Sequence, residues 1–72
     1  MSYSEPAVLW RLRDVDGNRA RATIIPGVPQ STLVIFVNEK FERGENFEEW
    51  AQALARADEV RRSLMESGWR AE

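Results

Sequence analysis

The sequence predicts an α+β fold: a three-stranded antiparallel meander, or four-stranded with a short extra strand, with one long C-terminal helix packed on one face. Two segments near the N-terminus alternate apolar and polar residues with the period of two typical of half-buried strands. A third segment is apolar on both faces, and the last third of the chain is rich in helix formers and has clear start and stop signals. With 72 residues, the chain is long enough for a single domain only.

The expected domain organisation follows the chain from one end to the other. We expect a flexible N-terminus over residues 1–6, the meander over 7–38, a connection or short edge strand over 39–46, the helix over 47–67, and a C-terminal cap and tail over 68–72.

The first two strands are expected over residues 7–14 and 19–25, on either side of a turn that contains Gly17. A two-residue loop would place Leu12 opposite Arg21 and would mix apolar and polar side chains on each face. A three-residue loop with Gly17 in the left-handed conformation keeps one face apolar, and a slip of one residue would invert every side chain. The preferred register pairs Leu12 with Ala20, Trp10 with Ala22, and Val8 with Ile24.

The third strand is expected over residues 32–38, after a loop that contains two prolines and a glycine. Its sequence, TLVIFVN, is rich in β-branched and aromatic residues, so it should be the best buried strand. The following segment is polar and charged. Within it we expect at most a short edge strand around Phe41, over residues 40–43.

The helix over residues 47–67 has a signal at each end. Asn46 is the expected N-cap, with Glu49 at the capping-box position three residues later. Gly68 is the expected left-handed C-cap, and Trp69 stands where an apolar residue packs against Leu64. At ~1.5 Å per residue the helix is about 31 Å long, whereas a strand of seven or eight residues reaches only ~25 Å, so part of the helix should overhang the sheet.

The expected core combines one face of the sheet with one side of the helix. Its members are Val8, Trp10, Leu12, Ala22, Ile24, either Ile35 or Phe36, Trp50, Leu54 and Val60. Arg61 interrupts the apolar side of the helix, and Asp58 lies at the edge of that side, three residues earlier. A guanidinium in such a position must reach water, pair with Asp58 or cross an interface. Arg61 and Asp58 are therefore the candidate dimer-interface residues.

The composition excludes several classes of chemistry. The chain has no cysteine and no histidine, which excludes disulfides, thiolate chemistry and the usual zinc sites. The segment from Asp14 to Asn18 carries oxygen ligands at alternate positions, but it lacks the glycine and glutamate that a calcium loop needs. The glutamates over residues 39–49 are typical of solvated charge. We therefore expect no catalytic residues, no cofactor and no metal, and a carboxylate-based enzyme is the most remote alternative.

Charge is distributed unevenly along the chain. Residues 1–37 have a net charge of +1, from four arginines and three acidic residues, and residues 38–72 have −3, from six basic and nine acidic residues. The preferred register places four arginines on the face of the hairpin away from the helix, where like charges opposite one another destabilise the sheet. These candidate anion-binding or partner-binding residues are Arg11, Arg13, Arg19 and Arg21.

Together these patterns predict a small non-enzymatic interaction module that acts as a homodimer. The third strand is apolar on both faces while the helix covers only one, so a second copy could cover the remaining surface. A different protein is a further expected partner. The alternative function is single-stranded nucleic-acid binding by the arginine face. Neither a signal peptide nor a membrane-spanning segment is recognised, so we expect a cytoplasmic protein with no membrane partner.

Overall fold

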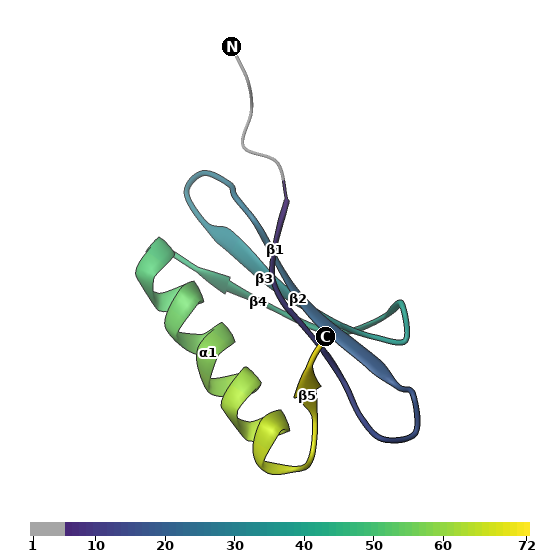
Figure 1. Ribbon diagram of the computed structural model, residues 1–72. Helices are drawn as coiled ribbons and strands as arrows, with labels where there is room; N and C mark the ends of the chain where they lie inside the picture. The colour runs from purple at the N-terminus through teal and green to yellow at the C-terminus, as the bar shows by residue number, and fades with distance from the viewer. Residues whose placement is uncertain (1–5) are drawn as a thin grey trace.

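The computed structural model describes residues 6–72 as an antiparallel sheet with one helix against one face (Figure 1). The elements are β1 (Ala7–Arg13), β2 (Arg19–Ile25), β3 (Ser31–Val37), β4 (Lys40–Phe47), α1 (Trp50–Glu66) and β5 (Arg70–Ala71). The sheet order is β4-β3-β2-β1-β5. The α+β class and the antiparallel meander are confirmed, but the sheet has five strands rather than three or four. Most of the predicted flexible N-terminus, residues 1–5, lies outside the described residues.

The register of the first hairpin is correct near the turn and wrong near its open end. Leu12 pairs with Ala20 and Trp10 with Ala22, as predicted. Val8, however, pairs with Thr23 rather than Ile24, because a β-bulge between Val8 and Trp10 inserts one extra residue. The extra residue, Leu9, packs against the core cluster, and Val8 is left exposed. The bulge therefore changes which of two neighbouring apolar residues is buried.

The turn of this hairpin is confirmed in its details. Gly17 has a φ of +87°, and the pair of backbone hydrogen bonds between Asp14, Gly17 and Asn18 encloses a three-residue loop. The Asp14 carboxylate accepts hydrogen bonds from the backbone N–H of Asp16 and of Asn18, at 3.0 and 2.8 Å, and from the Asn18 side chain at 2.9 Å. The Asn18 side-chain bond is the largest of the causes that lower the pKa of Asp14. These bonds give the Asp14 carboxylate a structural role in the turn.

The segment expected to be a connection or a short strand is instead a full strand, β4. A two-residue turn leads into it, with Asn38 and Glu39 at φ values of 52° and 66°. Such turns normally carry glycine, and asparagine tolerates positive φ better than most other residues do. β4 then pairs with β3 over its whole length, from Lys40 opposite Val37 to Phe47 opposite Ser31. Because the strand is mostly polar and lies at the sheet edge, hydrophobic periodicity does not reveal it.

The start of α1 differs from the prediction, whereas its end agrees with it. The helix begins at Trp50 with Glu49 as N-cap, and no side chain caps it. Asn46, the predicted cap, lies in β4 and accepts a hydrogen bond from the Thr32 hydroxyl at 2.7 Å. At the other end Gly68 has a φ of +105°. A Schellman arrangement is completed by the N–H of Trp69 bonding to the Leu64 carbonyl at 3.0 Å and the N–H of Gly68 to the Met65 carbonyl at 3.1 Å.

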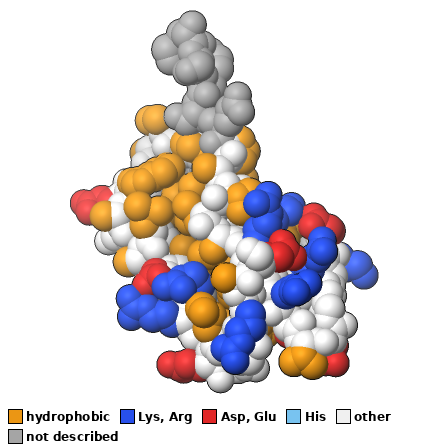
Figure 2. Space-filling view, viewed as in Figure 1, with side chains coloured by type: hydrophobic (Ala, Val, Ile, Leu, Met, Phe, Trp, Pro, Cys, Tyr) orange, Lys and Arg blue, Asp and Glu red, His pale blue; other side chains and the backbone are white. Residues whose placement is uncertain are grey.

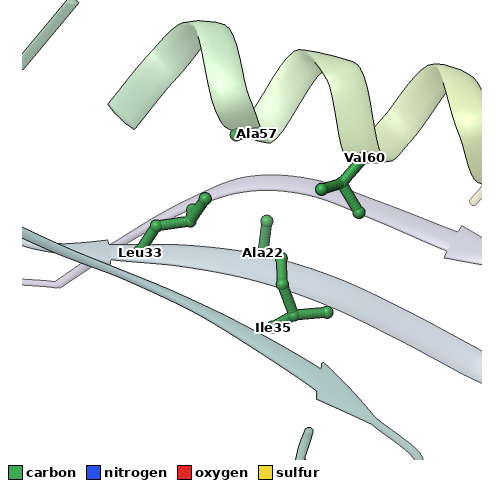
Figure 3. Packing of buried hydrophobic residues seen from close by; sticks show 5 residues of the cluster. All are labelled: Ala22, Leu33, Ile35, Ala57 and Val60. Carbon is green, nitrogen blue, oxygen red and sulfur yellow. The ribbon is translucent and has the colours of Figure 1, made fainter. Parts of the chain in front are cut away.

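The core lies between the helix and the middle strands, where small residues allow the two layers to approach closely. Figure 3 shows Ala22, Leu33 and Ile35 of the sheet below Ala57 and Val60 of α1. The predicted core members Leu12, Ala22, Ile24, Ile35 and Val60 are buried. Three others are wrong, because Val8, Trp50 and Leu54 are 41%, 46% and 39% exposed. Trp10 is half-buried, and its indole N–H donates to the Ala57 carbonyl at 2.9 Å.

Within residues 6–72, no helix combines the length and the apolar composition needed to cross a membrane.

Candidate interaction surfaces

The two flanks of α1 have different surroundings, and we call them the closed flank and the open flank. The closed flank faces β4. There the Arg56 side chain contacts both oxygens of the Glu45 carboxylate at 3.3 Å and bonds the Glu59 carboxylate at 3.1 Å. Both carboxylates raise the pKa of Arg56, and the larger contribution comes from Glu59. The open flank lies on the side of β1, from which the Trp10 indole reaches the helix backbone. Only the closed flank is joined to the sheet by an ion pair among the described residues.

The open flank is a row of side chains spaced three and four residues apart. Such spacing places Trp50, Leu54, Arg61 and Met65 along one line of the helix. Ala51 and Ala55, both exposed, lie beside Trp50 and Leu54. In Figure 2 hydrophobic side chains gather over the N-terminal half of α1 and the neighbouring strand ends, and charged side chains gather over the other half of this face. Trp50 and Leu54 are therefore the exposed apolar side chains of this flank, and tryptophan is enriched at protein interfaces.

The structure brings the two candidate dimer-interface residues together at the C-terminal end of the open flank. Both Nε and Nη2 of Arg61 bond one Asp58 carboxylate oxygen, at 3.1 and 2.8 Å, and Arg61 also lies 3.2 Å from the Met65 sulfur. Arg62 pairs with the same carboxylate. The bonds from Arg61 and Arg62 lower the pKa of Asp58. The Arg61 side chain is still 38% exposed, so it remains accessible to a partner.

The four candidate arginines form two directly opposed pairs on the first hairpin. Arg11 is the partner of Arg21 across β1 and β2, and Arg13 is the partner of Arg19. Their neighbours Leu12 and Ala20 are buried on the helix side of the sheet. Since side chains alternate along a strand, the arginines lie on the helix-free face, as the hairpin register predicts.

Two of these arginines contact carboxylates from distant segments of the chain, and one of them also contacts an aromatic ring. The Arg21 guanidinium bonds Glu39 at 2.9 Å and lies 4.2 Å from the centre of the Phe36 ring. Arg19 bonds Glu72 at 3.0 Å. Together these residues line a small cavity of about 70 Å³. The cavity lining comprises Arg11, Arg19, Ala20, Arg21, Phe36, Glu39 and Glu72.

Three of the four predicted arginines therefore meet at one cavity, and the fourth does not. Arg13 lines a separate shallow hollow beside Arg70 and the turn of the first hairpin. Neither Arg11 nor Arg13 has an ion pair with another residue of the described range 6–72. Sequence patterns do not predict Glu39 and Glu72 as neighbours of the arginines. A recognisable turn at residues 38–39 would have placed Glu39 there, but nothing local predicts that Glu72 returns to β1.

No group of three or more Asp, Glu, His or Cys side chains in the described part of the chain is arranged to hold a metal ion. The glutamates between residues 39 and 49 do not converge. Glu39 pairs with Arg21 and Glu45 with Arg56, on opposite faces of the sheet.

Comparison with protein-family models, curated proteins and solved structures finds no match for this chain.

Proposed function

We propose that the protein is a small non-enzymatic interaction module that forms a homodimer through the open flank of α1. The observation that carries the proposal is that the side chains of Trp50 and Leu54 remain exposed to solvent although the helix packs on the sheet of the same chain. Aromatic side chains are enriched at the centres of protein interfaces, where a few buried residues supply most of the binding free energy. A cytoplasmic location remains part of the same proposal.

The small residues beside this pair support helix-to-helix contact. Ala51 and Ala55 would let a second α1 approach at the lower end of the usual interaxial range, ~8 Å. In an antiparallel pair related by a two-fold axis, Leu54 of one copy would pack against Ala55 of the other. Such a pair is self-complementary and closed, as most homodimers are.

Charge at the ends of the helix supports the same arrangement. An antiparallel pair that crosses between Leu54 and Ala55 brings Arg61 of one copy, which lies ~10 Å from the crossing point, toward the N-terminal end of the other helix, which Glu48 and Glu49 precede. Arg61 is partly exposed and its Asp58 partner is already shared with Arg62. A second carboxylate beside Arg61 would therefore add to the existing contacts without breaking them.

The edge of the sheet favours a closed dimer over strand addition. β5 pairs only with Leu12 and Arg13 of β1, and the N–H of Glu72 bonds the Arg11 carbonyl at 3.1 Å. The remaining part of β1 contains the bulge at Leu9. Bulges at an edge interrupt the row of backbone groups that another strand would need. At the other edge of the sheet, β4 has charged side chains and a register shift opposite Ile35 and Phe36, which also disfavour strand addition, so side-chain packing of the helices is the better route to association.

Light scattering on the purified protein at tens of micromolar tests the proposal. A homodimer gives twice the chain mass of 8.3 kDa. Its thermal midpoint should also rise with protein concentration, because association stabilises the folded state by mass action. A monomer of 8.3 kDa with a cooperative unfolding transition independent of concentration would overturn the proposal.

Single-stranded nucleic-acid binding is the second candidate function. The exposed aromatic ring of Phe41 shares the helix-free face with the arginines, and aromatic rings beside guanidinium groups are typical of single-strand platforms. Against it, carboxylates already neutralise Arg19 and Arg21, and the chain has a net charge of −2. We expect no measurable oligonucleotide binding at physiological salt. If all four arginines did contact phosphates, the log–log salt slope would be about −2.8.

A further inference from the structure

The arginine cavity on the helix-free face carries more positive charge than the protein itself neutralises. Arg11 and Arg21 are directly opposite each other in the ladder, as are Arg13 and Arg19. Like charges in such positions destabilise a sheet. The three arginines of the cavity and the two carboxylates of Glu39 and Glu72 leave a local charge of +1. An anionic group bound here would remove an existing repulsion and would therefore bind more favourably than at an isolated arginine.

The two internal ion pairs show which anion the cavity accommodates. The Phe36 ring lies under the Arg21 guanidinium, and stacking of this kind holds the planar fork in place while Glu39 occupies its edge. Glu72 reaches Arg19 from the chain that follows β5, next to β1. Each of the two arginines, Arg21 and Arg19, is thus paired with a single carboxylate. In the second case an extended backbone antiparallel to β1 delivers it.

The surroundings of the cavity indicate what else such a partner would carry. Val8, Ile25 and Phe41 are all exposed on the same helix-free face as the arginines. The face is thus basic in one part and apolar in the other. A segment that alternates acidic and apolar side chains matches both parts, whereas a nucleic-acid strand offers phosphates without apolar side chains.

We propose that Arg11, Arg19 and Arg21 form a binding site for a carboxylate side chain of an acidic, partly apolar peptide segment, and that Glu72 occupies part of this site in the free protein. The site lies on the helix-free face, so it goes beyond the proposed dimer and does not depend on it. Glu72 is an internal competitor, because its carboxylate bonds Arg19 within the cavity that the peptide enters.

Fluorescence anisotropy with a labelled peptide of alternating glutamate and valine tests the proposal. We expect saturable binding that Arg11→Gln weakens by about tenfold or more, since a charged hydrogen-bonding partner is lost. Arg43→Gln is the matched control: it removes the same charge from the helix side of β4 and should leave the affinity within about twofold. A peptide of alternating glutamine and valine should not bind.

A substitution with the opposite expected sign separates a site from general charge attraction. Glu72→Gln should strengthen peptide binding roughly two- to fivefold, because it removes the competing carboxylate. Glu66→Gln makes the same charge change on an exposed part of α1 and should not reproduce this gain. Binding should persist in a Leu54→Glu variant designed to be monomeric, so failure of the dimer and failure of the site are distinguishable.

Three results would overturn the proposal. The first is the absence of saturable peptide binding. The second is an equal effect of Arg11→Gln and Arg43→Gln in variants whose circular dichroism shows an intact fold. The third is tighter binding of oligothymidylate than of the peptide, which would identify the face as a nucleic-acid surface instead.

Discussion

The closed and open flanks of α1 belong to one helix, but the sheet of the same chain covers the closed flank more fully than the open flank. On the closed flank, Arg56 is bonded to Glu45 of β4, and Val60 is 6% exposed. On the open flank, Trp50 and Leu54 stay in contact with solvent. Hydrophobic periodicity is similar on both flanks, so it does not distinguish a surface that the chain buries itself from one that it leaves for a partner. The distinction arises from where the helix lies on the sheet.

A charge placed on the open flank should have the largest effect. Leu54→Glu puts a carboxylate at the centre of the proposed helix pair, where it would be buried without a partner in each copy. We expect the mass measured by light scattering to fall from twice 8.3 kDa to 8.3 kDa. Gln52→Glu adds the same charge at an exposed position away from the open flank and should leave the dimer intact. Equal masses for the two variants would show that the dimer does not form through the open flank.

Truncation on each flank should separate folding from association. Val60→Ala removes buried methyl groups and should lower the free energy of unfolding by about 2 kcal/mol at any protein concentration. Leu54→Ala should lower the thermal midpoint only at concentrations at which the wild type is dimeric. Thermal unfolding followed by circular dichroism over a hundredfold range of concentration checks both. A concentration-independent loss in Leu54→Ala would assign Leu54 to the core of the single chain.

The partly exposed arginine should have a smaller effect on association. Arg61→Gln should weaken the dimer about two- to fivefold, the usual range for exposed ion pairs, and should leave the fold unchanged. Glu48→Gln should weaken it similarly, and the double variant should be no weaker than either single one. Dissociation constants from sedimentation equilibrium provide the double-mutant cycle. Additive losses would mean that Arg61 and Glu48 do not meet.

The smallest effect should come from protonation of Asp58. Arg61 and Arg62 lower its pKa from the ordinary value of 3.8 in the folded protein. A carboxyl with a depressed folded pKa stabilises the protein above its unfolded pKa, and this contribution is lost as the pH falls through the folded pKa. The wild type should therefore lose more stability than Asp58→Asn on acidification below about pH 4. Parallel pH curves for the thermal midpoints of the two proteins would contradict this.

Features specified by neighbouring residues could be predicted from the sequence. The left-handed turn at Gly17 and the helix end at Gly68 depend on glycine at one position, and both are confirmed. The arginine face follows from strand alternation once the turn is known. Asn46 shows the limit of such reasoning, because a residue suited to cap a helix pairs within β4 instead.

Features that depend on contacts between distant segments could not be predicted. β5 is only two residues long and exists because the chain after Gly68 returns to β1. The cavity needs Glu72, which arrives by that route, and Glu39, which a turn without glycine presents. Trp50 was expected in the core because it is large and apolar. The helix instead contacts the sheet through Ala53 and Ala57, because the two layers lie too close together at these positions for a large side chain.

Disulfide cross-linking of single-cysteine variants tests the open flank most directly, because the natural sequence contains no cysteine. Ala55 lies next to the proposed crossing point of the two helices, whereas Ser63 is exposed on another side of α1. A disulfide needs two Cα atoms within about 7 Å, so only a position near the two-fold axis can form one between copies without distortion. Under mild oxidation, Ala55→Cys should give a covalent dimer much faster than Ser63→Cys. Cross-linking of the two variants at equal rates would contradict dimerisation through this flank.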